Sequence, residues 1–506
     1  MNPTPQQKAF LDAVTETDRN IGLIARAGCG KTTAILMAVK AYAEKYPDNI
    51  IHVCAFNKAI AVEVGDKLKA SGFTDWQKYG ASTLHSMGAG LVNFAFKKPV
   101  VNENKIQDII YFLQEQESSL QTTYKLYIGQ ILALVRYAKQ SAVGFFDDMP
   151  IGDKTVWYKL AEHYDVNGFD DTSIIDQVVE AAQEVYRRSL NWTETIDYDD
   201  MILFPLVYNI KVKYTKDLIL VDEYQDVSRA KQALARKFLK PGGRMMAIGD
   251  DRQAIYGFTG ADSKALSSFI EQMDAITLPL SVTWRCPKSV VNEANKLVPD
   301  LEAADSAIDG EVIRTNQMPE DLIPGKEEDA ILCRNMAPLV GIAYSLITSG
   351  VPCKVEGRKI GEGLINLVNR WGKDITTSKL IDRLENYKDR EIQKALAKGN
   401  ESKVQEVEDK VGTILEIIKV LNKENKTKAS DVVEFIDNLF ADGKDKVVTL
   451  ATYHRSKGRE WKRVILLEHA SRCPSKYARQ VWQKEQEINL AYVAITRAKR
   501  TLIYLR

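Results

Sequence analysis

The sequence has few cysteines and no paired ones. The six are scattered at positions 29, 54, 286, 333, 353 and 473 without a CxxC pair, and the five histidines form no HExxH motif. This spacing argues against a zinc or iron–sulfur site, so no metal cluster is expected. Free thiols are typical of a reducing compartment, and most of these cysteines are expected to be buried as small apolar residues.

A long apolar run and an excess of charge are also lacking. No stretch approaches 18 consecutive apolar residues, which predicts no transmembrane span. Residues 1–7 have neither the basic start nor the apolar core of a secretory signal, so the protein is expected not to be secreted and to contact no membrane. Lys and Arg total 69 against 68 Asp and Glu, a net charge of +1, so any surface for a polyanion must be local.

What remains is the composition of a globular α/β protein. The chain has 506 residues, of which 45% are apolar and 27% charged, and this length predicts two to four domains. In residues 1–92 short apolar runs alternate with helical patterns, which is typical of βαβ units and a parallel sheet. Residues 93–195 have a helical pattern instead. Strands are expected at 21–25, 50–55, 218–221 and 245–248.

A second α/β region is predicted to begin near residue 276. Strands are expected at 330–333, 447–450, 464–467 and 502–504, and a charged, helical stretch at 366–445 interrupts them. Within that stretch, apolar residues at 404, 407, 411, 414, 418 and 421 follow a 3-4 spacing that places them on one side of a helix. The pattern covers fewer than three heptads, so it favours an amphipathic helix packed on its own domain over an intermolecular coiled coil.

A glycine-rich loop follows the first predicted strand. Residues 25–32 read Ala-Arg-Ala-Gly-Cys-Gly-Lys-Thr and precede a helical pattern. Backbone N–H groups can curl around phosphate oxygens where glycine leaves room, and the helix N-terminus adds partial positive charge. In such a loop Lys31 reaches the β- and γ-phosphates and the Thr32 hydroxyl ligates Mg²⁺. The nucleotide-binding residues predicted from this loop are Ala27, Gly28, Cys29, Gly30, Lys31 and Thr32.

Two acidic residues, Asp222 and Glu223, follow the strand predicted at 218–221. They emerge at its carboxyl end, where ligands of open α/β sheets bind. Asp222 is placed to hold Mg²⁺, and Glu223 to polarise the attacking water as general base. The alternative is that both only cap the following helix, but the glycine-rich loop favours the catalytic interpretation.

Six motifs then follow in order along almost the whole chain. They are TPQQ at 4–7, DEYQD at 222–226, GDDRQAIYGF at 249–258, LSVTWR at 280–285, TYHRSKGREW at 452–461 and NLAYVAITRAK at 489–499. In type and order they resemble the motifs of the UvrD/Rep-type DNA helicases of superfamily 1A, including the F-box DNA helicase branch. The resemblance implies an ATP- and Mg²⁺-dependent motor.

The resemblance implies further roles around the nucleotide. Gln7 would read the adenine edge, Trp284 would stack on adenine, and Glu460 would contact the ribose or the γ-phosphate. Gly458 belongs to the same motif as Glu460, and Thr33 stands where some members have an Arg near adenine. These five residues are added to the predicted nucleotide site.

The catalytic set implied by the resemblance has six members. They are Lys31, Asp222, Glu223, Gln253, Arg285 and Arg497. Gln253 would sense the γ-phosphate, and the two arginines, from the second α/β domain, would stabilise charge on the transferred phosphoryl group. Arginine suits this role because its planar fork stays charged and bonds in a bidentate way. Without the motifs, a surface ion pair would be the favoured interpretation of each arginine.

A DNA track is also implied by the resemblance. AFNKA at 55–59 and TLHS at 83–86 are similar to DNA-contacting motifs of the family. Aromatic faces would stack on bases, and donors would bind phosphates. For any one aromatic, core packing is the alternative. The predicted DNA contacts are Phe56, Asn57, Lys58, Thr83, His85, Tyr256, Phe258, Thr452, His454 and Lys457.

Several positions depart from the family pattern. Ala25 replaces the first glycine of the P-loop, Arg26 replaces a small residue, and Thr259 stands where relatives often carry an Arg that touches DNA. The insertion at 366–445 is much shorter than the accessory subdomain of the larger bacterial members. The short insertion leaves its role in duplex binding and autoinhibition open, and Thr259 leaves one phosphate anchor of the family without a counterpart.

The expected architecture is two RecA-like P-loop motor domains with parallel sheets, each interrupted by a mainly helical insertion. The first domain is expected at 1–92 and 196–275 with an insertion at 93–195, and the second at 276–365 and 446–506 with an insertion at 366–445. The expected function is a monomeric, cytoplasmic or nucleoid-associated DNA helicase that moves 3′→5′ on single-stranded DNA, acts at single-strand/duplex junctions and works with replication or repair proteins. A translocase that displaces proteins without separating strands and a catalytically idle DNA-binding scaffold are the alternatives.

Overall fold

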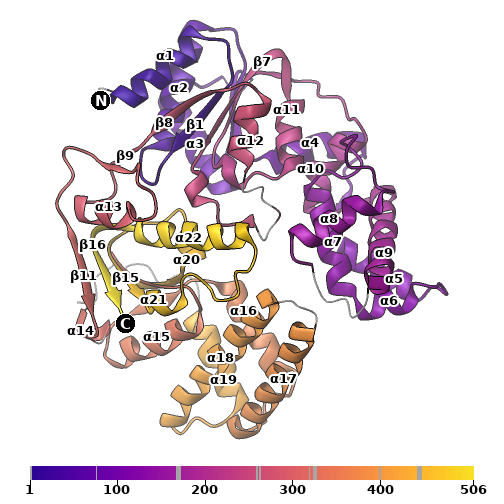
Figure 1. Ribbon diagram of the computed structural model, residues 1–506, viewed down its shortest axis with the longest axis vertical. Helices are drawn as coiled ribbons and strands as arrows, with labels where there is room; N and C mark the ends of the chain where they lie inside the picture. The colour runs from indigo at the N-terminus through magenta and orange to yellow at the C-terminus, as the bar shows by residue number, and fades with distance from the viewer. Residues whose placement is uncertain are drawn as a thin grey trace. The chain divides into compact units, whose positions relative to one another are not determined.

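A computed structural model describes residues 3–75, 77–166, 172–257, 260, 264–317, 319–322, 328–397, 401–440 and 447–506. The chain forms two compact units. The first consists of residues 1–26 and 30–281, and the second of residues 27–29 and 282–506. Each has its own sheet and its own set of helices (Figure 1).

The first unit is built on a six-stranded sheet. Its order is β3-β2-β6-β7-β1-β8, and every pair of neighbours is parallel. The central strands are apolar and buried on both faces, as parallel sheets require. The strands are β1 (Ile21–Ala25), β2 (Ile51–Cys54), β3 (Tyr79–Ser82), β6 (Lys216–Val221), β7 (Leu239–Gly249) and β8 (Ile276–Leu280).

The helices of the first unit either flank this sheet or form a helical region between residues 93 and 195. The flanking helices are α1 (Pro5–Glu16), α2 (Lys31–Lys45), α3 (Lys58–Ala70), α4 (Leu84–Ala95), α10 (Tyr198–Val207), α11 (Arg229–Lys237) and α12 (Ala265–Gln272), with 3-10 turns η1 (Tyr224–Asp226) and η2 (Asp251–Gln253). The helical region contains α5 (Lys105–Gln114), α6 (Gln121–Leu126), α7 (Ile128–Gln140), α8 (Lys154–His163) and α9 (Thr172–Asn191). A short parallel pair, β4 (Val100–Val101) and β5 (Thr195–Ile196), marks both ends of that region.

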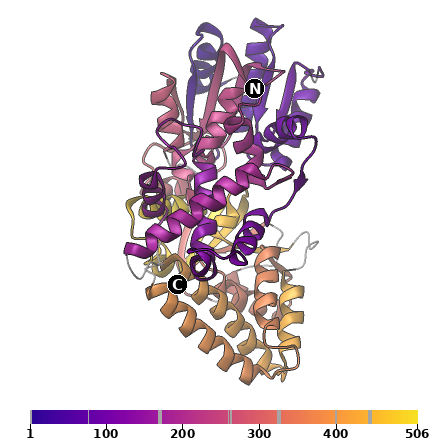
Figure 2. The same cartoon turned by 90° about the vertical axis from the view of Figure 1, so that its right-hand side faces the viewer.

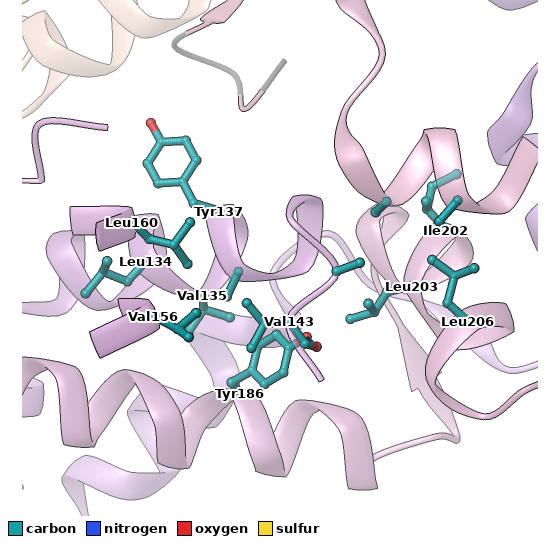
Figure 3. Packing of buried hydrophobic residues seen from close by; sticks show 14 of the residues in the cluster. Leu134, Val135, Tyr137, Val143, Val156, Leu160, Tyr186, Ile202, Leu203 and Leu206 are labelled. Atoms are coloured by element: carbon teal, nitrogen blue, oxygen red, sulfur yellow. Dashed lines mark hydrogen bonds between the residues drawn. The ribbon is translucent and has the colours of Figure 1, made fainter. Parts of the chain in front are cut away.

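The helical region does not have a core of its own. Leu134 and Val135 of α7 belong to the same buried cluster as Ile202 and Leu203 of α10 and Ile219 of β6 (Figure 3). A continuous apolar cluster makes the region one folding unit with the sheet. The prediction of helices between residues 93 and 195 is confirmed by α5–α9.

The second unit also has a six-stranded parallel sheet, in the order β11-β16-β15-β12-β14-β13. A two-stranded pair, β9 (Val282–Thr283) and β10 (Glu302–Ala303), lies outside it. The strands of the sheet are β11 (Glu311–Thr315), β12 (Asp329–Cys333), β13 (Cys353–Val355), β14 (Val448–Thr452), β15 (Trp461–Leu467) and β16 (Ala498–Leu505).

Four helices, α16–α19, gather at one end of the second unit (orange in Figures 1 and 2). The helices of this unit are α13 (Lys288–Ala294), α14 (Pro319–Leu322), α15 (Ala337–Thr348), α16 (Arg358–Asn369), α17 (Thr377–Ala397), α18 (Glu401–Lys423), α19 (Ala429–Leu439), α20 (Tyr453–Ser456), α21 (His469–Arg472) and α22 (Val481–Ile495). All six residues of the predicted apolar stripe are buried on α18, and Val411 and Ile418 pack with Leu339 of α15. The stripe therefore packs within its own unit, as predicted.

One predicted boundary is wrong. The segment at 276–280 was assigned to the second α/β region, but as β8 it pairs with β1 in the first sheet, Ile21 opposite Ile276. The first unit therefore extends to Ser281. A strand's partner is set by contacts that span some 250 residues of chain, and the local apolar pattern of β8 carries no information about them.

All six cysteines are free and buried, as their dispersed spacing predicted. Burial raises the pKa of the Cys54 thiol to about 12, so it stays protonated and behaves as an apolar group. Across the described ranges, no helix combines the length and apolar character that crossing a bilayer demands.

Candidate active site and nucleic-acid interface

The glycine-rich loop joins β1 to α2 in a conformation that needs glycine. Gly28 and Gly30 have φ of +73° and +80°, in the left-handed region that side chains disfavour. Gly30 is the N-cap of α2, and Lys31 is the first residue of the helix. The first N–H groups of α2 thus have no partner within the helix, which suits an anion. This geometry has room for the phosphate cradle that the sequence predicts.

Lys31 is paired with Glu223 across the carboxyl edge of the first sheet. Lys31 Nζ lies 2.7 Å from Glu223 Oε1. Burial alone would lower the pKa of Lys31, but the carboxylates of Glu223, Asp222 and Asp250 outweigh it and raise the pKa. The lysine therefore stays charged, and three acidic side chains compete for its positive charge.

The two acidic residues after β6 repel one another. Burial raises the pKa of Asp222, and the neighbouring charge of Glu223 raises it further. Asp222 Oδ1 accepts a hydrogen bond from the Glu223 N–H at 2.9 Å. A divalent cation would relieve this repulsion, so the donor set of Asp222 and the Thr32 hydroxyl in the first turn of α2 fits Mg²⁺.

Gln225 connects the ends of β6 and β7, and the sequence analysis gave it no role. Its Nε2 donates to Glu223 Oε2, and its Oε1 accepts a hydrogen bond from the Asp250 N–H at 2.9 Å. A Cβ on Gly249 would lie 2.4 Å from Gln225 Oε1, so that glycine makes room for the amide. The single Gln of the DEYQD motif was the signal that could have identified it.

Gln253 and Arg26 meet on the buried carboxylate of Asp250. Gln253 Nε2 donates to Asp250 Oδ2 at 2.7 Å, and Arg26 Nη1 donates to Asp250 Oδ1 at 2.8 Å. Arg26 also pairs with Asp251. Arg26, which departs from the usual P-loop sequence, thus has two acidic partners. The spacing of the motif could not reveal them.

Gln7 lies beside the glycine-rich loop. Its Oε1 accepts from the Thr4 N–H at 3.0 Å in a capping box, while its Nε2 would lie 3.9 Å from a Cβ on Gly30. The preceding residue, Gln6, exchanges two hydrogen bonds with Ser281, one with its N–H and one with its hydroxyl. The TPQQ segment is therefore fixed next to the predicted nucleotide site.

In the second unit Arg285 is paired, as the alternative interpretation expected. Arg285 Nε lies 2.6 Å from Glu460 Oε2, and Lys499 Nζ lies 3.2 Å from Glu460 Oε1. Burial would raise the pKa of Glu460, but these two cations outweigh it and lower the pKa. Glu460, predicted to contact the nucleotide, is thus engaged with protein cations. Gly458, close by, has a φ of +82°.

Arg497 is not a surface ion pair. Its side chain is buried and donates to the carbonyls of Val493 and Arg459 and to the Thr496 hydroxyl. The Cys286 thiol donates to the Thr496 carbonyl at 3.6 Å, and these two residues directly follow Arg285 and directly precede Arg497. The structure brings the two predicted fingers together within one unit.

Trp284, next to Arg285, exposes 59% of its surface. Its exposure is compatible with the predicted stacking on a base.

Two predicted stacking residues of the first unit lie face to face. The rings of Phe56 and Tyr256 are 6.1 Å apart between centroids with planes 10° from parallel, and Phe56 is 43% exposed. Core packing does not describe this pair. Phe258 lies outside the described residues.

Two predicted DNA contacts have another use. The Asn57 side chain accepts from the Ile60 N–H at 2.9 Å and caps α3, and Thr83 accepts from the Ser86 N–H at 3.1 Å and caps α4. Lys58 and Thr83 line a groove of about 590 Å³. Capping uses only the side-chain oxygen as an acceptor, so the Asn57 amide N–H groups and the Thr83 hydroxyl keep donors that suit a phosphate.

The predicted histidine contacts are neutral near pH 7. Burial lowers the pKa of His85 to about 4, helped by Lys231. Burial lowers the pKa of His454 to about 3, helped by the cations Arg334, Arg455 and Lys457. These rings can therefore donate and accept hydrogen bonds but bring no charge.

The loop after β14 contains the remaining predicted contacts. Thr452 ends the strand and precedes α20, and Lys457 follows that helix. Arg334, directly after β12, forms a forked pair with Glu487 at 2.7–3.2 Å.

Comparison with known proteins agrees with these observations. The model of the UvrD/REP helicase N-terminal domain matches residues 4–274. The ATP-dependent DNA helicases PcrA of Staphylococcus epidermidis and Staphylococcus aureus are each 26% identical over 309 residues, which cover 57% of this chain and 39% of the relative. The chain thus spans about two fifths of the length of these relatives. The match to more than half of the chain, in the unit with the P-loop, makes this protein a member of the UvrD/Rep helicase family.

Proposed function

We propose that the chain is an ATP-dependent DNA helicase that moves along single-stranded DNA and separates duplexes. One observation carries the proposal. A chain of contacts in the first unit runs from Lys31 through Glu223, Gln225 and Asp250 to Gln253. Three residues after Gln253 stands Tyr256, whose ring faces Phe56. Chemistry at a phosphate on Lys31 can therefore alter the position of an aromatic pair suited to bases.

The residues of the first unit would act on ATP in sequence. The N-terminus of α2 and Lys31 would bind the phosphates. Thr32 and Asp222 would hold Mg²⁺, which when bound would supply positive charge to the phosphates. Glu223 accepts a proton from the attacking water once a phosphate has taken its place beside Lys31. Gln253 would respond to the presence of the γ-phosphate. Its amide donates to Asp250, and the charge of Asp250 also raises the pKa of Lys31.

The second unit would contribute the arginine fingers. Arg285 would exchange Glu460 for the γ-phosphate, and Arg497 would add a second positive charge. ATP binding would then draw two motor domains together, and hydrolysis would release them. We assign these domains to residues 1–92 with 196–281 and to 282–365 with 446–506, with helical insertions at 93–195 and 366–445. Movement 3′→5′ is proposed from the family resemblance.

A second candidate is a translocase that displaces bound proteins without separating strands. The observation in its favour is the small size of the α16–α19 group, which offers few surfaces to a duplex. Forked substrates with a 3′ or a 5′ tail, assayed beside a protein-displacement substrate, separate the two candidates. Displacement without strand separation would favour the translocase.

The decisive experiment compares ATP turnover with and without single-stranded DNA in the wild type and in Glu223→Gln. Loss of a general base costs ~10²–10⁴-fold in rate. The variant is expected to lose turnover while ATP and DNA binding persist, because Gln keeps a hydrogen bond to Lys31. Glu63→Gln, on exposed α3, is the matched control. Undiminished turnover in Glu223→Gln would reject the assigned base, and wild-type turnover indifferent to DNA would reject the motor.

A further inference from the structure

The first unit has a strongly basic and aromatic surface away from the residues discussed so far. It consists of the exposed lysines Lys97, Lys98, Lys211 and Lys213 and the exposed rings of Phe94 and Tyr214, and is called here the basic face. Phe94 is 84% exposed and Tyr214 67%. Segments 93–101 and 207–216 contain no Asp or Glu. Because the whole chain has a net charge of only +1, this concentration of positive charge is a local feature of the surface.

The two segments of the basic face are joined in space. The ring of Phe96 lies 5.1 Å from that of Tyr208, centroid to centroid. The Tyr208 hydroxyl donates to the Leu190 carbonyl, which fixes the start of the second segment. Lys237, in the last turn of α11, donates to Asn209 at 2.9 Å and adds another cation at the border. Segments more than 100 residues apart thus form one continuous surface beside α4 and α10, which lie together in Figure 1.

The acids around the basic face do not neutralise it. Asp217 is paired with Lys240 at 2.7 Å. Glu194 precedes β5, and its carbonyl accepts from the Val100 N–H. Neither acid is paired with any of the four lysines of the face among the ion pairs of the described residues. The positive charge is therefore available to a ligand.

Two of the lysines are held in a conformation that disfavours them. Lys97 and Lys98 have φ of +56° and +62°, and the Lys98 N–H donates to the Asn93 carbonyl at 3.0 Å, closing the C-terminus of α4. Glycine is the usual residue here, because a Cβ disfavours the left-handed conformation. A favourable interaction with the dipole of α4 is one reason to place lysine there, but it does not require two in succession.

The basic face lies at the edge of the sheet opposite the ATP site. β6 begins at Lys216, directly after the second segment, and ends before Asp222. A strand of six residues spans about 20 Å, so the two sites are separate. A ligand here would not touch Lys31, Glu223 or the Phe56–Tyr256 pair.

We propose that the basic face binds a second segment of single-stranded nucleic acid, with Lys97, Lys98, Lys211 and Lys213 on its phosphates and Phe94 and Tyr214 stacked on its bases. Lysines alternating with open rings are the combination that a single strand needs, since every base has a face to stack and every linkage a charge. The proposal rests on the proposed function, in which the protein already holds one strand. Its consequence is that one molecule contacts two stretches of strand, such as the tracked strand and the displaced one.

The test compares Lys211→Gln/Lys213→Gln with Lys40→Gln/Lys462→Gln, whose lysines are exposed on α2 and β15. Each phosphate contact contributes about 0.7 to the slope of log affinity against log salt for a single strand. Loss of two contacts should lower the slope by about 1.4 for a long oligothymidylate. Stimulation of ATP turnover by an oligothymidylate of about 10 nucleotides, the size of one groove, should be unchanged. The control variant should match the wild type in both measurements.

Two further measurements separate a structural role from a binding role. Lys97→Gly should keep or raise the melting temperature, because glycine suits the left-handed φ, and still weaken binding of the long oligonucleotide. Bromodeoxyuridine in that oligonucleotide should cross-link to Tyr214 or Phe94 in the full chain. The proposal would be overturned if the double variant had the same salt dependence of affinity as its control and neither ring cross-linked. It would also be overturned if the wild type bound an acidic protein at this face but no oligonucleotide.

The outcomes distinguish the two proposals. A wild type that neither binds DNA nor responds to it in ATP turnover would reject the proposed function and the basic face together. A wild type that responds to the short oligonucleotide, while the double variant behaves as its control and neither ring cross-links, would reject the basic face alone.

Discussion

Arg26 Nη1 lies 2.8 Å from Asp250 Oδ1, so an unusual P-loop residue holds the buried acid at the end of β7. Asp250 also accepts from Gln253. Arg26 thus fixes the end of the network that starts at Lys31. The charge of Arg26 therefore matters for stability as well as for the site.

Arg26→Ala is expected to destabilise the first unit by about 3–5 kcal/mol, because it leaves a buried carboxylate without its cation. Thermal or urea unfolding measures this. Arg26→Ala/Asp250→Asn should recover part of the loss, since no buried charge remains. Arg19→Ala breaks the exposed pair with Asp274 and should cost less than about 1 kcal/mol. Equal losses for Arg26→Ala and Arg19→Ala would contradict the buried pairing.

Replacing either ring of the Phe56–Tyr256 pair should weaken the binding of single-stranded DNA. A base stacked on an aromatic ring is worth about 1–3 kcal/mol, so Phe56→Ala or Tyr256→Ala should lower affinity roughly 5- to 150-fold. Because the rings face one another, the double variant should lose less than the sum of the two single losses. Fluorescence anisotropy of a labelled oligonucleotide measures this. Tyr46→Ala, a ring packed on Tyr42, is the control, and additive losses would reject a shared site.

Buried strands were the most predictable part of the fold. Residues 21–25 were predicted as a strand and form β1, and 218–221 lie within β6, because strands buried on both faces are continuous apolar runs. β3 (Tyr79–Ser82) was missed since an edge strand with Gly and Ser has no such run. β8 was placed in the wrong region because its partner β1 is distant in sequence.

The candidate site was predictable where local geometry defines it. The P-loop glycines and Lys31 must lie within one short segment to cradle a phosphate, so their spacing reveals them. The partners of Arg26 and Gln225 were not predictable, because each depends on which strand ends the sheet brings together. For Asn57 and Thr83 the motifs identified the residues but did not predict that their side chains cap helices.

Arg285→Ala is expected to lower the maximal rate of ATP turnover by ~10³-fold or more, the effect of losing an arginine finger. Arg285→Lys should not restore the rate, because an ammonium cannot replace a forked guanidinium. Arg314→Ala, which removes an exposed arginine paired with Glu293, should leave turnover unchanged. Steady-state kinetics with saturating DNA measures the three variants. A rate restored by lysine would indicate that Arg285 serves only as a charge for Glu460.

Acid should destabilise the first unit through His52. Burial lowers the pKa of His52 to about 4, with help from Lys216, while the ring holds Ser82 Oγ at 2.8 Å. In the unfolded chain the ring takes a proton below about pH 6.5, and in the folded protein only below about pH 4. Stability contributed by neutral His52 is therefore full above pH 6.5 and falls as the pH drops from 6.5 to 4, by up to about 1.4 kcal/mol per pH unit.

His52→Gln removes this titration, so the variant should lose less stability than the wild type between pH 7 and pH 4.5. Urea unfolding at several pH values measures the difference. His163→Gln, at an exposed position on α8, should follow the wild-type curve. A His52→Gln variant that loses stability in acid as steeply as the wild type would show that other groups, such as the carboxylates around Lys31, control the acid limit.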